Sequence, residues 1–279
     1  MGSFSHPLGI APLTHLELSP AGMVGNAQDA GYDFLGLRLV PATPTEPQHD
    51  CRPGSALLRE TLARLRDSGL RLMDIEIFRL KPETDVGAYE PVLEAGALLG
   101  ARHALVAFQD SDPGRLGERF LAFSELAARH GLGVDVEPTP WYEVSTLADT
   151  AALIRASGAR DAGIVVDAIH FDRAGETPQT LAAIDPAYFR YAQLCDAPAE
   201  RPGDMDTLLF QARAERQIPG DGGLPLRSLL AGLPPGIALS LEVPMQSLAR
   251  RLDAGERARR LLERTRSFLA RTGDHAPRA

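Results

Sequence analysis

The stretch GVDVEPTPW, Gly133 to Trp141, reads as a strand that ends at a proline. Val134 and Val136 fall on one face of such a strand, whereas Asp135 and Glu137 fall on the other. A strand in the middle of the chain that directs two carboxylates the same way raises the question of what they contact. Because the other strand-like segments of the chain also end on polar side chains, these ends have to be considered together.

Composition limits the class of protein. The chain has 279 residues, of which 44% are hydrophobic and 24% charged, enough apolar surface for a full core. Its formal net charge of -8 argues against nucleic acid or an anionic membrane as a partner. No apolar run approaches the roughly 20 residues of a membrane span, and the first residues do not resemble a signal peptide, so we expect a cytoplasmic protein. Cys51 and Cys195 are expected to be free thiols.

Segments rich in Val, Ile and Leu alternate with longer segments of helical period from one end of the chain to the other. The predicted strands are residues 13–18, 34–40, 70–78, 103–108, 132–137, 163–168, 188–194 and 238–243. The predicted helices are residues 21–30, 55–67, 87–99, 115–130, 146–156, 226–233 and 254–271. Eight strands alternating with helices, and no long linker, predict an α/β fold with a single closed (β/α)₈ TIM barrel.

We assign residues 1–272 to the barrel domain and expect the polar tail, residues 273–279, to be disordered. An open doubly wound sheet is the alternative fold. That fold would be expected to carry a GxGxxG fingerprint after its first strand, and the corresponding turn here reads ELSPAGMVG.

In a (β/α)₈ barrel the active site lies at the carboxyl ends of the strands. The polar residues at the predicted ends are Glu17, Arg38, Glu76, Gln109, Glu137, Asp167, Gln193 and Glu242. Alternation along the strands allows the last four to converge. Converging carboxylates repel one another and are costly to desolvate, so three of them predict a cation. Oxygen ligands without thiolates favour Mg²⁺ or Mn²⁺, and Co²⁺ is also compatible. For any single residue, a strand cap or an ion pair is the simpler interpretation.

Five strings, VEPTPW, VVDAIH, QLCDA, RQIPGDGGL and LSLEVP, occur in this order. Because of these five strings, the chain resembles the sugar phosphate isomerase/epimerase superfamily, the xylose isomerase-like TIM barrels. The resemblance covers residues 8–269. The resemblance implies that Glu137, Asp167, Gln193 and Glu242 bind one divalent metal. Many members of the superfamily have His at the third position, whereas hydroxypyruvate isomerases resemble this chain in having Gln. An oxygen donor at that position would favour harder ions.

The resemblance also implies catalytic roles. Glu137 and Glu242 would act as an acid/base pair on opposite faces of the substrate, moving a proton at the carbon next to a carbonyl while the metal stabilises the enediolate. His170 matches a DxxH pattern and would bind a substrate oxygen. Arg201 and Arg216 follow the seventh predicted strand, and their positions make them candidates for substrate binding.

Other candidates rest on single residues. Trp141 could form a stacking wall for the substrate or a hydrophobic plug below a loop. Arg38 is a candidate to bind an anionic group of the substrate. Glu76 and Arg79 could form an internal ion pair. His15 and His103 are expected to be structural.

These features predict a metal-dependent isomerase or epimerase acting on a small keto-sugar or hydroxy-carbonyl compound. The alternative is a dehydratase, a lyase of a 3-dehydroshikimate-like or keto-inositol-like substrate, which begins with the same proton abstraction. A repair nuclease of the endonuclease IV type is disfavoured by an acidic chain with seven His. A noncatalytic binding protein is expected to have lost the metal ligands. The resemblance also allows a homo-oligomer.

Overall fold

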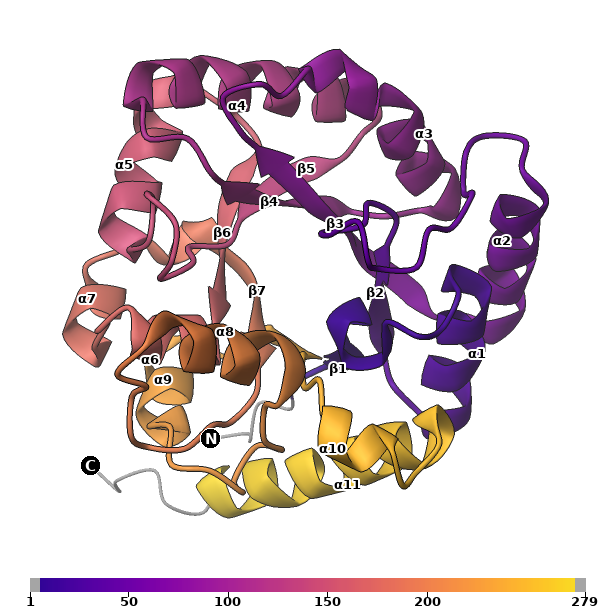
Figure 1. Ribbon diagram of the computed structural model, residues 1–279, viewed down its shortest axis with the longest axis vertical. Coiled ribbons are helices and arrows are strands. Elements are labelled where there is room, and N and C mark those ends of the chain that lie inside the picture. The colour runs from indigo at the N-terminus through magenta and orange to yellow at the C-terminus, as the bar shows by residue number, and fades with distance from the viewer. Residues whose placement is uncertain (1–5, 274–279) are drawn as a thin grey trace.

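The computed structural model describes residues 6–273 of the chain. Within them, eight parallel strands follow one another around a closed barrel in the order of the sequence, and β8 pairs with β1 to close it. Helices form an outer ring around the strands (Figure 1). The predicted single (β/α)₈ barrel is therefore confirmed. The predicted disordered tail lies outside the described residues, except for Gly273 at the end of the last helix.

The strands are β1 (Leu8–Ile10), β2 (Phe34–Arg38), β3 (Arg71–Leu80), β4 (His103–Phe108), β5 (Gly133–Val136), β6 (Ala162–Asp167), β7 (Phe189–Leu194) and β8 (Ala238–Leu241). The α-helices are α1 (Pro20–Ala30), α2 (Ala56–Ser68), α3 (Glu90–Leu99), α4 (Pro113–Arg129), α5 (Leu147–Ser157), α6 (Ala168–Arg173), α7 (Pro178–Ala182), α8 (Met205–Ala214), α9 (Leu226–Gly232), α10 (Gln246–Ala249) and α11 (Ala254–Gly273). Three 3₁₀ helices are η1 (Pro12–His15), η2 (Val86–Tyr89) and η3 (Pro186–Tyr188).

The first predicted strand is wrong. Residues 13–18 alternate in polarity, but most of this segment lies in η1 and the turn after it, because Pro12 has a fixed φ and begins a helical turn. The actual first strand, β1, has only three residues and is too short to show a period. Glu17 consequently lies outside the ring of strand ends, and its half-exposed side chain accepts a hydrogen bond from Arg257 of α11. The other seven predicted strands overlap the observed ones.

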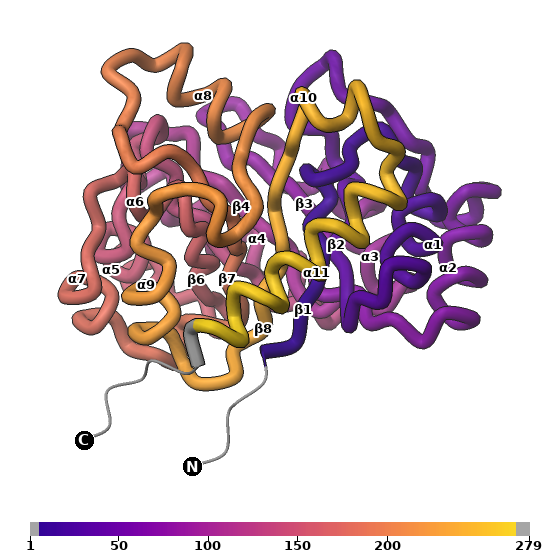
Figure 2. Tube along the Cα trace, turned by 90° about the horizontal axis from the view of Figure 1, so that it is seen from below, coloured from indigo at the N-terminus to yellow at the C-terminus, as the bar shows by residue number. Residues whose placement is uncertain are grey.

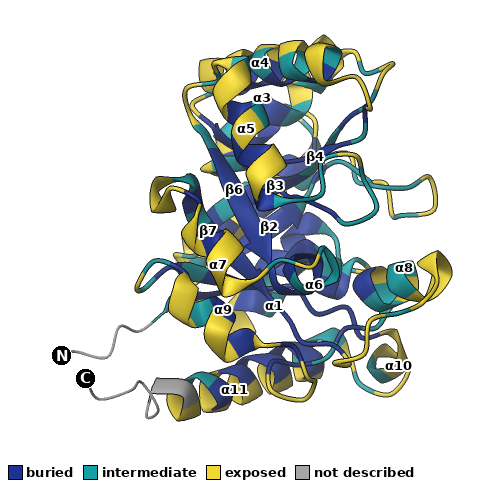
Figure 3. Ribbon diagram, turned by 90° about the vertical axis from the view of Figure 1, so that its left-hand side faces the viewer, coloured by how far each residue is buried: buried dark blue, intermediate teal, exposed yellow. Residues whose placement is uncertain are grey.

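The core lies between the barrel and its ring of helices. Helix α4 illustrates why, because Leu116, Phe120, Phe123 and Ala127 recur at helical spacing and are all buried against the sheet. Figure 3 shows the strands buried and the outer faces of the helices exposed. No helix in the described part of the chain is long and apolar enough to cross a membrane. Cys51 and Cys195 are both buried and free, as expected.

The chain between β7 and β8 contains an insertion that the sequence pattern did not predict, helix α8. It lies with α10 at one end of the barrel (Figure 2). Ala212 is its one buried residue, and Met205 and Phe210 are exposed. Two isolated antiparallel bridges, Asp196 with Gln217 and Glu215 with Met245, hold the chain that leaves α8 against the residues after β7 and β8. This insertion therefore carries its arginines to the ends of those strands.

Candidate active site

The carboxyl ends of β5 to β8 bring four of the predicted site residues into one buried region. Asp167 is the last residue of β6, Gln193 lies one residue before the end of β7, and Glu137 and Glu242 directly follow β5 and β8. The strand register pairs Asp167 with Gln193, which sets these two side chains on neighbouring strands at the same level. All four residues are buried. Gln193 Nε2 donates a hydrogen bond to Glu242 Oε1 at 3.3 Å.

Arg216 lies among these residues and is itself buried. Its Nη1 donates to Asp167 Oδ2 at 2.6 Å, and its Nη2 lies 2.9 Å from Glu242 Oε2. The guanidinium thus bridges two of the carboxylates proposed as metal ligands. Arg216 supplies one positive charge to the acidic cluster. The side chain predicted to bind substrate is thus paired with carboxylates of the protein itself.

Asp167 is the N-cap of α6, and its Oδ1 accepts hydrogen bonds from the backbone N–H groups of Ile169 and His170 at 2.9 and 3.0 Å. This cap directs His170 back into the site. The imidazole Nε2 lies 3.9 Å from Glu137 Oε1, and its Nδ1 lies 3.9 Å from Asp167 Oδ1. Glu137, Asp167 and His170 each present one atom within 4.8 Å of the others, which is close enough to hold a metal ion.

Unpartnered polar atoms test whether these residues fit a cation. Among the residues that the structure describes, Glu137 Oε1, Gln193 Oε1 and His170 Nδ1 are buried and find no hydrogen-bond partner. Buried polar atoms are usually hydrogen-bonded, and a bound cation would satisfy these three together. All three are lone-pair donors suited to a divalent cation such as Mg²⁺, Mn²⁺ or Zn²⁺. The residues present therefore fit a divalent metal, although His170 joins the predicted set.

The electrostatics agree with this interpretation. Burial raises the pKa of Glu137 well above its usual value, and the neighbouring Glu242 and Asp167 raise it further. Burial also raises the pKa of Glu242 to about 8, in spite of Arg216. Burial opposes ionisation of Asp167 as well, but Arg216 and His170 outweigh it and lower the pKa of that carboxyl. The cluster has more acidic groups than Arg216 can neutralise, and a further cation would relieve the repulsion.

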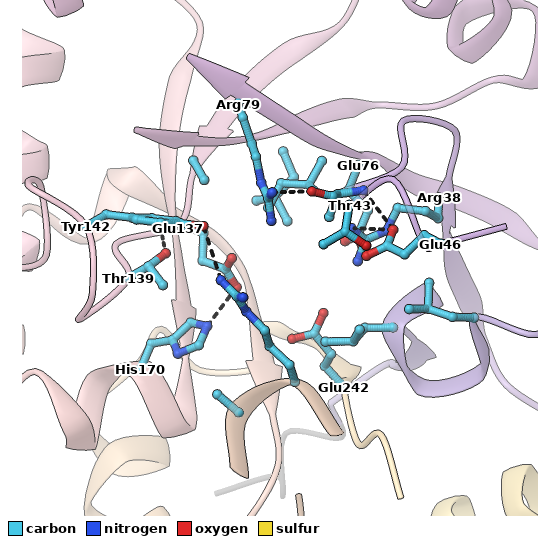
Figure 4. Close-up of a pocket in the computed structure, with 18 of the residues that line it drawn as sticks. Arg38, Thr43, Glu46, Glu76, Arg79, Glu137, Thr139, Tyr142, His170 and Glu242 are labelled. Atoms are coloured by element: carbon cyan, nitrogen blue, oxygen red, sulfur yellow. Dashed lines mark hydrogen bonds and ion pairs between the residues drawn. The ribbon is translucent and has the colours of Figure 1, made fainter. Parts of the chain in front are cut away.

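A cavity of about 250 Å³ opens in front of these side chains. Its lining includes Glu137 and Glu242, with His170 and Trp141 beside them. The edge of the Trp141 ring meets His170, with the ring centroids 4.9 Å apart. Trp141 lines the cavity and also packs against the core, a position compatible with both a stacking wall and a hydrophobic plug. Figure 4 shows Arg38 and Arg79 across the cavity from His170 and Glu242.

Two of the candidate arginines, Arg38 and Arg201, form ion pairs with acids of the protein. Arg38 lines the cavity but pairs with two acids, its Nη2 lying 3.0 Å from Glu76 Oε1 and its Nη1 3.8 Å from Glu46 Oε2. The predicted ion pair of Glu76 with Arg79 is therefore wrong, because Arg38 is the register partner of Glu76 across β2 and β3. Arg201 is exposed, is not part of the cavity lining, and lies 3.3 Å from Asp172.

Several residues of the cavity were not among the predicted site residues. Arg79 and Arg213 both line the cavity, together with Tyr142. Arg79 was predicted only to pair with Glu76, because the third strand was predicted to end at residue 78, whereas β3 continues to Leu80. Arg213 belongs to the unpredicted helix α8. Its only sequence signal is its position three residues before Arg216 in the segment that ends in RQIPGDGG.

The family model described as xylose isomerase-like TIM barrel matches residues 24–268. No curated protein matches the chain. Among solved structures, a xylose isomerase domain protein from Alicyclobacillus acidocaldarius is 22% identical, with a TM-score of 0.73 over 96% of this chain and 99% of the other.

Two further structures are similar in fold. The IolI protein, solved with a zinc atom, is 15% identical with a TM-score of 0.75, over 96% of this chain and 98% of that one. A D-allulose 3-epimerase from Methylomonas sp. is 15% identical with a TM-score of 0.68, over 96% of this chain and 100% of the other. At these identities the structures show a common fold. Because the family model covers most of the chain, this protein belongs to the xylose isomerase-like TIM barrel family.

Proposed function

We propose that the protein is a divalent-metal-dependent isomerase or epimerase that moves a proton at the carbon next to a carbonyl of a small hydroxy-carbonyl compound. The observation that carries this proposal is that Glu137 and Glu242 enter the same cavity from different strands, beside buried atoms that lack partners. The family and the epimerase among its structural neighbours agree with it.

Glu137, Asp167, Gln193 and Glu242 would hold the metal, and His170 is close enough to Glu137 and Asp167 to contribute. A divalent ion bound there would polarise the carbonyl and hydroxyl oxygens of the substrate and stabilise the negative charge that develops on them. The identity of the ion is left to experiment, with Mn²⁺ and Mg²⁺ as the first choices on ligand type and Co²⁺ or Zn²⁺ as others.

The protein side chains would carry the proton. Glu137 would remove it from one face of the substrate carbon, and Glu242 would return a proton on the other face, each acting as a general acid or base. His170, which burial keeps neutral by lowering its pKa to about 4, would orient a substrate oxygen. Trp141 would cover the apolar face of the substrate, because it lines the same cavity beside His170.

The test combines metal analysis with proton exchange. The untagged protein is expected to contain, or to take up on dialysis against Mn²⁺, about one divalent ion per chain. Glu242→Gln should weaken metal binding at least tenfold, and it should slow exchange of substrate carbon-bound hydrogen with deuterated solvent by about 10²–10⁴-fold. Glu17→Gln is the matched control, because this glutamate was expected at a strand end but lies outside the site.

A protein that takes up no metal from Mn²⁺, or a Glu242→Gln variant that binds metal as well as Glu17→Gln does, contradicts the proposal. The exchange assay uses ketoses, hydroxy-acids and cyclic polyol ketones. Water loss from any of them, detected as an ultraviolet enone signal, would assign the site to the dehydratase alternative.

A further inference from the structure

Two arginines form a wall of the cavity that the proposed proton transfer does not use. Arg79 comes from the end of β3, and Arg213 comes from α8. Both line the cavity that Glu137 and Glu242 enter. We call Arg79 and Arg213 the basic wall.

Neither arginine of the basic wall has a carboxylate partner. In the part of the chain that the structure describes, no Asp or Glu oxygen forms an ion pair with either one, whereas Arg38 and Arg216 each contact two acids. The charges of Arg38 and Arg216 are therefore compensated within the protein. Those of the basic wall are free to act on a ligand.

The guanidinium of Arg79 forms one hydrogen bond, but not all of its N–H groups have a partner among the described residues. Its Nη1 donates to the backbone oxygen of Ala42, and its Nε is buried and has no hydrogen-bond partner. Burial, together with the like charges of Arg213 and Arg38, lowers the pKa of this guanidinium. An acceptor in the cavity would satisfy this N–H group and offset the charge of the guanidinium.

Arg213 is held in place by aromatic side chains. Its guanidinium carbon lies 5.2 Å from the centroid of the Trp141 ring, and its Nη2 donates to the Tyr142 hydroxyl at 3.4 Å. Stacking on a ring fixes the plane of a guanidinium while leaving its remaining N–H groups available. Arg213 is thus oriented for a ligand that lies between it and the rest of the cavity.

We propose that the substrate is a small anion, whose carboxylate or phosphate group is bound by the basic wall while its carbonyl end faces Glu137 and Glu242. This inference rests on the proposed function, since it specifies the substrate class for the same cavity. Guanidinium groups match the oxygens of carboxylates and phosphates in geometry as well as charge. The cavity of about 250 Å³ limits the anion to a small molecule. An uncharged sugar would leave both guanidinium groups uncompensated.

The test compares three matched probes of three carbons: D-glycerate, sn-glycerol 3-phosphate and uncharged glycerol. Binding is measured by isothermal calorimetry and by the fluorescence of Trp141, the single Trp of the chain. The measurements are made with EDTA present, so that chelation of a metal by the probes does not contribute. At least one anion is expected to bind tenfold or more tightly than glycerol. The preferred anion then decides between carboxylate and phosphate.

Arg79→Gln and Arg213→Gln should each weaken binding of the preferred anion at least tenfold and leave glycerol unchanged. Arg155→Gln, which removes an exposed arginine of α5 away from the cavity, is the matched control and should have no effect. Glycerol binding as tightly as both anions, or a double variant that keeps the anion preference, would overturn the inference.

The outcome is separate from that of the proposed function, because no turnover is measured. A protein that binds no metal but prefers anions through the basic wall would contradict only the proposed function. An active metal enzyme without this preference would contradict only the present inference.

Discussion

The barrel contains two layers of buried and partly buried polar groups that differ in what they face. The site layer comprises Glu137, Asp167, Gln193 and Glu242. A deep layer, further down the barrel, comprises Asp74, His103, Asp135, Arg190 and Tyr191, and none of its residues lines the cavity. Both layers contain acids that burial makes hard to ionise, because the pKa values of Asp74 and Asp135 are raised to about 7 and that of Glu242 to about 8.

In the deep layer the side chains contact one another, and Arg190 also pairs with the exposed Asp161. The Tyr191 hydroxyl donates to Asp74, and Asp135 lies 3.0 Å from His103 Nδ1 and 3.4 Å from Arg190 Nε. Asp135 shares a strand face with Glu137, as the sequence predicts, but its contacts lie within the deep layer. The comparison teaches that a buried acid with a raised pKa does not by itself mark a site. What separates the two layers is that Glu137 and Glu242 of the site layer line the cavity, whereas no residue of the deep layer does.

The largest expected effect tests how the site layer is neutralised. Arg216→Met removes the one cation between Asp167 and Glu242, and we expect the metal-free protein to lose about 3–5 kcal/mol of unfolding free energy. Mn²⁺ should restore much of this loss, because a ligand at 100 times its dissociation constant contributes about 2.7 kcal/mol. Urea unfolding with EDTA or with Mn²⁺ measures both quantities.

The matched variant for Arg216→Met is Arg190→Met, which removes an arginine from the deep layer. Mn²⁺ should raise the unfolding free energy of Arg190→Met by no more than it raises that of the unmodified protein. Equal rescue of both variants by Mn²⁺ would show that the ion does not replace the charge of Arg216, and the distinction between the layers would fail.

A smaller effect concerns the pH dependence of stability. The pKa of Asp74 is higher in the folded state, at about 7, than its ordinary value of 3.8, mainly because of burial. The folded state therefore binds more protons, so the contribution of Asp74 is fully present below about pH 4 and is lost as the pH rises through 7. Asp74→Asn should make the free energy of unfolding fall less steeply between pH 4 and 7.

The pKa of Asp110 is shifted in the opposite direction from that of Asp74. Hydrogen bonds from Arg115 lower its pKa to about 2, so its contribution is present above about pH 4 and is lost as the pH falls through 2. Asp110→Asn should leave the slope between pH 4 and 7 unchanged. Urea titrations at several pH values compare the two variants, and identical slopes would remove the argument that burial dominates at Asp74.

The smallest expected effect comes from Tyr191→Phe, which removes the hydroxyl that donates to Asp74. We expect a loss of about 1–2 kcal/mol of unfolding free energy, the usual result of leaving one buried acceptor without its donor. Exchange activity per folded molecule should stay within about threefold of the unmodified protein if the deep layer is only structural. A large loss of activity at unchanged stability would place this layer in the catalytic machinery.

The sequence by itself determined the fold and much of the candidate site. The alternation of strands and helices can be read from local sequence periods, and it predicted the barrel. Since all parallel strands of a barrel end at one rim, Glu137, Asp167, Gln193 and Glu242 could be assembled from their positions alone. The prediction of the first strand was wrong because β1 has only three residues, and the next element, η1, begins with Pro12.

Only the tertiary structure decided which charges meet. Glu76 pairs with Arg38 instead of the nearby Arg79, because the register of β2 and β3 sets those two residues side by side. The position of Arg216 depends on an insertion that returns across the end of the barrel, and the same insertion brings Arg213 over Trp141. Such contacts join residues far apart in the chain, and no local period encodes them. The sequence therefore determined which acids line the rim, and the folded chain determined which arginines neutralise them and which stay free for a ligand.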